Sequence, residues 1–211
     1  MLYQPAAFRE DRPEILHGLI HRARLALLAS NGEDGVPDIT HLPLTLVAEE
    51  GPQGTLYGHV ARANPHWRRL AVAGRAVAVF RGAEAYVSPN WYPSKAEHHR
   101  VVPTWNYEAV HAEGPVTIIE EAEALHTLVS RLTEERERGQ PRPWAVTDAP
   151  AEFVAGMLKG IVGVALRIER LSGKRKLSQN RDAADREGAI AGLAASENAA
   201  DRATAEAMRD V

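Results

Sequence analysis

Hydrophobic residues near the start of the chain recur at the spacing of an amphipathic helix. Asp11 stands at an N-cap position, Pro13 lies in the first turn, and Glu14 follows the cap by three residues, as in a capping box. The next apolar positions fit a period of 3.6 residues: Ile15, Leu16, Leu19, Ile20 and Ala23. The pattern predicts one helix that packs a single face against a core.

Short apolar or alternating runs further along predict β-strands separated by turn residues. The predicted strands are residues 25–29, 38–47, 56–60, 76–80, 84–88, 107–119 and 163–171. Asn31-Gly32 and Asp34-Gly35 supply turn residues for a hairpin between the first two strands. Gly82 separates the fourth strand from the fifth, and Gly114-Pro115 bends the sixth.

Helical patterns lie between and after these strands. We predict helices over residues 65–70, 121–138, 151–159 and 182–211, the last divided near Ser196. Because the helices and strands follow no strict βαβ rhythm, the expected fold is α+β, an antiparallel β-barrel with peripheral helices. We expect a single domain over residues 1–211, of which about 182–211 form a C-terminal helical tail.

Composition restricts the setting. The formal net charge is −3, so DNA binding would need a local basic patch. The absence of cysteine excludes disulfides, thiolate metal sites and a cysteine nucleophile. No apolar run approaches the roughly 18 residues of a membrane span, and the charged N-terminus is unlike a signal peptide. We therefore expect a cytoplasmic protein.

Aromatic residues gather between residues 67 and 107. They are Trp67, Tyr86, Trp91, Tyr92, Trp105 and Tyr107. The segments 88–95 and 102–107 combine stiffening prolines with large rings that need burial. Two interpretations remain open: the rings form a slot for a flat cofactor, or they simply close the end of the barrel.

Residues 59–64 bring an imidazole, a guanidinium and a carboxamide to a predicted junction between strand and helix. These groups belong to His59, Arg62 and Asn64. Free backbone N–H groups at a helix start favour an anion, so a phosphate or a propionate could bind there. The alternative is that His59 is a satisfied structural group and that Arg62 pairs with a neighbouring carboxylate.

The stretch from residue 167 to residue 181 is distinctly basic. Against one acid, Glu169, it holds Arg167, Arg170, Lys174, Arg175, Lys176 and Arg181. Polar residues follow from Ser178 to Asn180. Such a stretch could hold a phosphorylated cofactor, face DNA phosphates or form a solvated strand edge.

Several long runs, in order and in register, resemble the PaiB family of FMN-binding negative transcriptional regulators. They are HVARANPHW, AYVSPNWYPSK, VVPTWNY, PWAVTDAP and GKRKLSQNR. The resemblance covers nearly the whole chain. It implies a split β-barrel with peripheral helices, a homodimer with pockets across the subunit interface, FMN as cofactor, and a role in bacterial gene regulation that could involve promoter DNA.

The resemblance also assigns pocket roles to residues of this chain. With Tyr86 and Asn106 from the aromatic segments, the predicted cofactor-binding residues are His59, Arg62, Asn64, Tyr86, Ser88, Trp91, Lys95, Thr104, Trp105, Asn106, Lys174, Lys176, Ser178 and Gln179. The family commonly has tryptophan where this chain has Arg175. That difference predicts a missing aromatic surface and a stronger basic patch.

Two alternatives use the same fold. The related piperazate synthases bind haem b, and His59 matches their axial iron ligand, although this chain keeps the longer PaiB loop over residues 91–102. An FMN-dependent oxidoreductase is suggested only by analogy with the wider superfamily. No catalytic residue can be assigned, and a metal ligand, His59, is expected only if haem is the cofactor.

Overall fold

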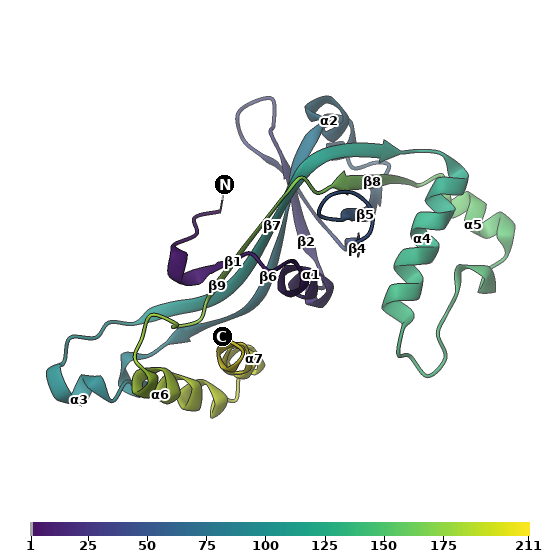
Figure 1. Cartoon of the computed structure of the whole chain (residues 1–211). Coiled ribbons are helices and arrows are strands. Elements are labelled where there is room, and N and C mark those ends of the chain that lie inside the picture. The colour runs from purple at the N-terminus through teal and green to yellow at the C-terminus, as the bar shows by residue number, and fades with distance from the viewer. Residues whose placement is uncertain (1) are drawn as a thin grey trace. The chain divides into compact units, whose positions relative to one another are not determined.

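The computed structural model describes residues 2–211, which form two compact units. The central unit comprises residues 20–80 and 111–171, and the terminal unit comprises residues 2–19, 81–110 and 172–211. Four elements contribute residues to both units: α1 (Pro13–Arg22), β6 (Arg75–Val87), β7 (Thr104–Ile119) and β9 (Arg170–Lys176) (Figure 1).

The central unit is built on antiparallel strand pairs. Its other strands are β2 (Ala26–Ser30), β3 (Asp38–Leu42), β4 (Thr45–Val47), β5 (Thr55–Ala61) and β8 (Ile161–Arg167). They pair in the orders β3-β2-β6 and β7-β8-β5-β4. The predicted hairpin is confirmed, because Ala26 pairs with Leu42 and Ser30 pairs with Asp38 in antiparallel register.

Helices of the central unit cover part of this sheet. They are α2 (His66–Ala73), α4 (Ala122–Glu137), the 3-10 helix η3 (Val146–Asp148) and α5 (Ala151–Leu158). Helix α4 packs against β5 and β8 and buries Leu125, Leu128 and Leu132. The Glu121 side chain accepts from the backbone N–H groups of residues 123 and 124 and caps α4, which begins within one residue of the predicted start.

The terminal unit combines both ends of the chain. It contains η1 (Ala6–Phe8), β1 (Arg9–Glu10), η2 (Pro89–Trp91), α3 (Ser94–His98), β9 (Arg170–Lys176), α6 (Ala183–Ala194) and α7 (Ala199–Arg209). Strand β9 pairs with β1 and with β7. Helices α6 and α7 lie side by side (Figure 1) and share a core with Val87, Tyr92 and Leu177.

Three strand predictions are wrong in detail. The predicted strands 76–80 and 84–88 are one strand, β6 (Arg75–Val87), because Gly82 allows close approach: a Cβ there would lie 2.8 Å from Glu108 atoms. The predicted strand 163–171 is two strands, β8 and β9, and the second continues to Lys176. The predicted strand 38–47 is interrupted at Pro43, between β3 and β4.

The fold class is α+β with antiparallel strand pairing, as the sequence pattern predicts. Helices α1, α4 and α5 are confirmed, while α2 starts one residue later than predicted and extends to Ala73. In the C-terminal part, Asp182 caps α6 and Asn198, rather than Ser196, caps α7. Among residues 2–211, every helix is too short or too polar to cross a bilayer.

Candidate functional site

An exposed ring pair lies on β6 and β7 in the terminal unit. Tyr86 and Trp105 meet edge to face, with ring centroids 6.4 Å apart and planes inclined by 60°. About half of each residue is exposed, 49% for Tyr86 and 51% for Trp105. Amphipathic rings that stay half-exposed offer an apolar surface on which a flat ligand ring can pack.

Two lysines of β9 lie beside aromatic residues of the same unit. Lys176 Nζ donates to the backbone oxygen of Trp105 at 2.6 Å and to the Thr104 hydroxyl. Lys174, two residues earlier and therefore on the same strand face, lies 5.1 Å from the ring centroids of Tyr3 and Tyr107. Lys174 is 5% exposed, whereas Lys176 is partly exposed. We call Tyr86, Thr104, Trp105, Lys174 and Lys176 the basic-aromatic surface, of which Lys174 is the buried member.

Three cations on or after β9 have no acidic partner. Within residues 2–211, no ion pair involves Lys174, Lys176 or Arg181. Burial lowers the pKa of Lys176, and the positive charges of Lys174 and Arg181 lower it further. Cations that destabilise one another in this way are stabilised by a bound anion, and phosphate is the anion that lysine commonly holds in proteins.

Arg175 does not add to this positive charge. Strand alternation turns its side chain away from Lys174 and Lys176, and Arg175 is 5% exposed. Its Nε donates to Glu108 Oε1 at 2.7 Å, and its Nη1 lies 4.0 Å from Glu10 Oε2. The prediction that Arg175 strengthens the basic patch is therefore wrong, because the buried carboxylate of Glu108 neutralises it, with Glu10, the partner of Arg12, close by.

Three other predicted residues support the end of β9 from within. Asn106, fully buried, donates through Nδ2 to the Ser178 hydroxyl at 3.0 Å. Ser178 has a positive φ of 65°, a backbone conformation that few non-glycine residues adopt. Gln179 accepts from the Leu177 N–H and donates to the Arg175 carbonyl at 2.6 Å. These contacts fix the turn that follows the two lysines.

The segment from Ser88 to Lys95 is held mainly by packing. The Ser88 hydroxyl accepts from the Asn90 N–H and caps η2, and Lys95 Nζ donates to the Asn90 carboxamide. Trp91 packs against α6 so closely that a Cβ at Gly192 would lie 2.3 Å from its ring. A pocket of about 470 Å³ is lined by Trp91 and Lys95 among other residues of this segment.

Arg62 belongs to the central unit, where backbone carbonyls and a carboxylate occupy its guanidinium. Its Nη1 contacts Glu120 Oε2 at 2.6 Å, its Nε donates to the Lys159 carbonyl at 3.0 Å, and its Nη2 donates to the Ile161 carbonyl at 3.1 Å. These contacts match the structural alternative for Arg62 and join the end of β5 to the start of β8.

Asn64 takes part in a polar network at the start of α2. Its Oδ1 accepts from the His66 N–H at 3.0 Å, and its Nδ2 donates to the Thr40 hydroxyl at 3.2 Å. His66, 2% exposed, contacts Thr40 Oγ1 at 2.7 Å and Ser30 Oγ at 3.1 Å. The Asn64 carboxamide therefore accepts the hydrogen bond at the helix start where the sequence predicted that an anion could bind. Sequence reasoning missed His66, although it lies within the same motif.

His59 lies in β5, opposite Gly163 of β8. Directly paired residues share a sheet face, and a Cβ at Gly163 would lie 3.0 Å from Leu128 and 3.1 Å from Leu125 of α4. The imidazole therefore lies on the face that α4 covers. Its Nδ1 is buried without a hydrogen-bond partner, and burial lowers the pKa of His59.

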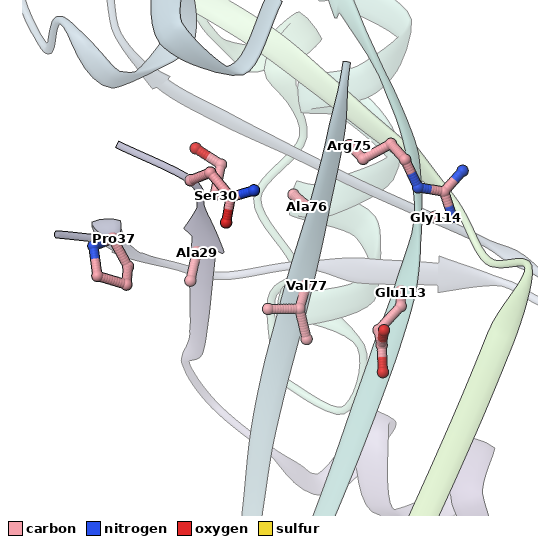
Figure 2. A pocket seen from close by; sticks show the side chains of 9 residues that line it. Ala29, Ser30, Pro37, Arg75, Ala76, Val77, Glu113 and Gly114 are labelled. Carbon is pink, nitrogen blue, oxygen red and sulfur yellow. The ribbon is translucent and has the colours of Figure 1, made fainter. Parts of the chain in front are cut away.

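A further pocket of about 350 Å³ opens on the central unit (Figure 2). Its lining comes from the end of β2, from Pro37, and from β6 and β7, and it includes none of the predicted site residues. The charged lining residues are already paired: Arg75 with Glu169 at 2.8 Å, and Glu113 with Arg170. Little unbalanced charge is left there for a polar ligand.

Residues 2–170 match the family model described as "Putative FMN-binding domain". The chain belongs to this family. The Bacillus subtilis "Protease synthase and sporulation protein PAI 2" is 31% identical over 210 residues, which cover 99% of this chain and 97% of that protein. An uncharacterized protein of Aspergillus fumigatus is 34% identical over 219 residues, covering 88% and 84% of the two chains.

These matches confirm the predicted PaiB family and FMN as the cofactor of that family. Among solved structures, the FAD and haem binding protein from Mycobacterium smegmatis has a TM-score of 0.58 at 19% identity. The similarity covers 86% of this chain and 79% of that one. At this identity the comparison concerns the fold, which is the split β-barrel that the family resemblance implies.

The residues present fit a flavin mononucleotide. Lys176, partly exposed, and Lys174, 5% exposed beside Tyr3 and Tyr107, supply positive charge for its phosphate. The half-exposed Tyr86 and Trp105 rings suit its planar ring system. Tyr107, one of the aromatic residues of the predicted slot, and Tyr3, which the sequence did not assign to the pocket, flank Lys174. Tyr3 was missed because its contact with β9 joins segments that are far apart in the sequence.

Proposed function

We propose that this protein is a PaiB-like negative transcriptional regulator that binds FMN at the basic-aromatic surface. The observation that carries the proposal is the pair Lys174 and Lys176, which has no carboxylate partner and lies beside aromatic rings. Membership of the FMN-binding family supports the choice of ligand. The name of the Bacillus subtilis relative, which refers to protease synthesis and sporulation, agrees with a regulatory role.

Each residue of the surface has a defined task in this proposal. Lys174 and Lys176 bind the phosphate. The Trp105 carbonyl and the Thr104 hydroxyl orient the Lys176 ammonium group. Tyr86 and Trp105 pack against the ring system and exclude water from it. Bound FMN supplies one- and two-electron redox chemistry.

Flavin titration tests the site. FMN binding, followed by quenching of flavin fluorescence, is expected to weaken about 10- to 100-fold in Lys174→Ala and in Lys176→Ala, because charge-assisted hydrogen bonds to phosphate are lost. Riboflavin, which lacks the phosphate, is expected to bind both variants as it binds the unaltered protein. Lys159→Ala, which changes a lysine of the central unit, is the matched control. Unchanged FMN affinity in both β9 variants would refute the site.

Regulation, assembly and location are part of the same proposal. We expect a cytoplasmic homodimer, which light scattering of the purified protein would test. We also expect retardation of a promoter fragment at low salt, with weaker retardation as salt rises, because phosphate contacts release counterions. No retardation of fragments from the protein's own upstream region, with and without FMN, would contradict direct DNA binding.

A second candidate, haem binding, follows from His59. Its Nδ1 has no hydrogen-bond partner, and the lowered pKa favours the neutral imidazole that ligates iron. Against it, the imidazole lies on the face covered by α4, so haem would require α4 to shift. A Soret band after reconstitution that disappears in His59→Ala would favour haem. A band that persists in this variant would reject His59 as the ligand.

A further inference from the structure

A pocket of about 390 Å³ lies between β4 and α4 in the central unit, away from every predicted cofactor residue. Its polar lining includes Thr45 of β4, only 4% exposed, and Glu135 of α4, which is partly exposed. Glu49, Glu134 and Arg138 also line the pocket and are exposed. Leu46 and Val47 add apolar lining. The volume falls within the range of small-molecule sites.

Two polar atoms of this pocket have no partner. Thr45 Oγ1 and Glu135 Oε2 are both buried and make no hydrogen bond. The other carboxylate oxygen, Glu135 Oε1, lies 3.6 Å from His21 Nδ1, which is longer than a hydrogen bond. Buried polar atoms in proteins nearly always have partners, so two orphaned acceptors in one pocket point to a ligand that donates hydrogen bonds.

Arg131, one of the two arginines that line the pocket, already has partners. Thr45 pairs with Tyr57 across β4 and β5, so the two side chains share a sheet face. The Tyr57 hydroxyl donates to Glu50 Oε2 at 2.5 Å, and Arg131 lies over the Tyr57 ring and 3.3 Å from Glu50 Oε1. Arg131 and Glu50 therefore balance each other, and neither neutralises Glu135.

The remaining charges favour a cation. Glu49, Glu134 and Glu135 face one permanent cation, Arg138, and the imidazole of His21, which lies 3.6 Å from Glu135 Oε1. In the part of the chain that the structure describes, no ion pair involves Glu49, Glu134 or Arg138. A metal ion is not favoured, because no group of three His, Asp or Glu side chains within residues 2–211 is arranged to hold one. An ammonium group combines positive charge with three N–H donors, which suits the two orphaned acceptors.

We propose that this pocket binds a small primary amine, whose ammonium group donates to Glu135 Oε2 and Thr45 Oγ1 and whose alkyl chain contacts Leu46 and Val47. The site is separate from the flavin site, since its residues belong to the central unit and those of the basic-aromatic surface belong to the terminal unit. If the amine-binding proposal failed, the FMN-binding proposal would be unaffected, and failure of the FMN-binding proposal would leave the amine site unaffected.

Calorimetry and thermal unfolding with n-butylammonium as probe test the proposal. Two matched ligands separate its components: 1-butanol has the chain without the charge, and tetramethylammonium has the charge without N–H donors. We expect n-butylammonium alone to bind and to raise the Tm. Equal shifts with tetramethylammonium would show general cation screening and would overturn the proposal, as would no heat of binding and no shift.

Variants locate the binding. Glu135→Gln is expected to weaken n-butylammonium binding at least about tenfold, and Thr45→Val about fivefold, in line with the loss of a charged and a neutral hydrogen bond. Thr45→Val removes an unpartnered hydroxyl, so without ligand it is expected to unfold at the same temperature or higher. Glu152→Gln, on exposed α5, is the charge-matched control. Equal affinity in all three variants would overturn the assignment, and FMN titration of each checks that the flavin site is intact.

Discussion

Arg175 Nε donates to Glu108 Oε1 at 2.7 Å, and both side chains are buried in the terminal unit. Glu10 lies on the other side of the guanidinium, 4.0 Å from Nη1. The buried guanidinium of Arg175 is therefore neutralised mainly by Glu108, while Glu10 is also held by Arg12.

Loss of Arg175 is expected to destabilise the protein strongly. Arg175→Ala leaves Glu108 buried without its cation, while Glu10 keeps its pairing with Arg12. The loss lowers the free energy of unfolding by about 3–5 kcal/mol. Urea denaturation measures the change. Arg175→Met combined with Glu108→Gln is expected to recover much of the loss, because no uncompensated charge then remains. Arg170→Ala, which breaks an exposed pair with Glu113, is the control and is expected to cost less than about 1 kcal/mol.

Glu10 is expected to make stability depend on acid pH. Hydrogen bonds from Arg12 hold the pKa of Glu10 below its usual value, despite the opposing effect of burial. At a pH between the folded and the unfolded pKa of Glu10, the unfolded state binds more protons than the folded state. The stability that ionised Glu10 contributes is therefore fully present above the unfolded pKa of roughly 4.3. It is lost as pH falls through the lower pKa of the folded state. Glu10→Gln should flatten the fall of Tm below about pH 5. An unchanged pH profile would contradict this assignment.

Gly192 is expected to be required for the packing of Trp91. A methyl group at this position of α6 would lie 2.3 Å from the indole ring, so Gly192→Ala should displace the ring and cost about 1–3 kcal/mol. Gly156→Ala in α5 is the matched control, since nothing lies within 4 Å of its added Cβ. Helix propensity predicts that this control gains about 0.5–1 kcal/mol. Urea denaturation and tryptophan fluorescence distinguish the two variants.

His66 is expected to make the central unit less stable as pH falls. Burial lowers the pKa of His66, so the folded state keeps the imidazole neutral while the unfolded state takes up a proton. Stability should therefore fall as pH drops below the unfolded pKa of roughly 6.5. His66→Asn should reduce the change in Tm between about pH 7.5 and pH 5.5, while exposed His98→Gln should leave it unaltered. Parallel profiles in all three proteins would rule out this role.

Local patterns predicted the elements that depend on local physics. The period of residues 15–23 predicted α1, Glu121 marked the start of α4, and two turn dipeptides predicted the hairpin of β2 and β3. Gly82 misled the prediction because its role is long-range: it makes room for Glu108, which lies 26 residues later. A glycine required by a distant side chain looks the same in sequence as one that ends a strand.

The residues of the candidate site show the same difference between what local sequence predicts and what depends on tertiary contacts. Sequence alone identified the aromatic and basic residues, the family and its cofactor, because residue type and ordered motifs carry that information. Only the tertiary structure decided which cations are free. Lys174 and Lys176 have no acidic partner, whereas Arg175, between them in sequence, faces Glu108 and Glu10. Arg62 donates to backbone carbonyls, and Asn64 accepts from the His66 N–H. The reason is physical: whether a charge can bind a ligand depends on the partners that folding brings to it from distant parts of the chain.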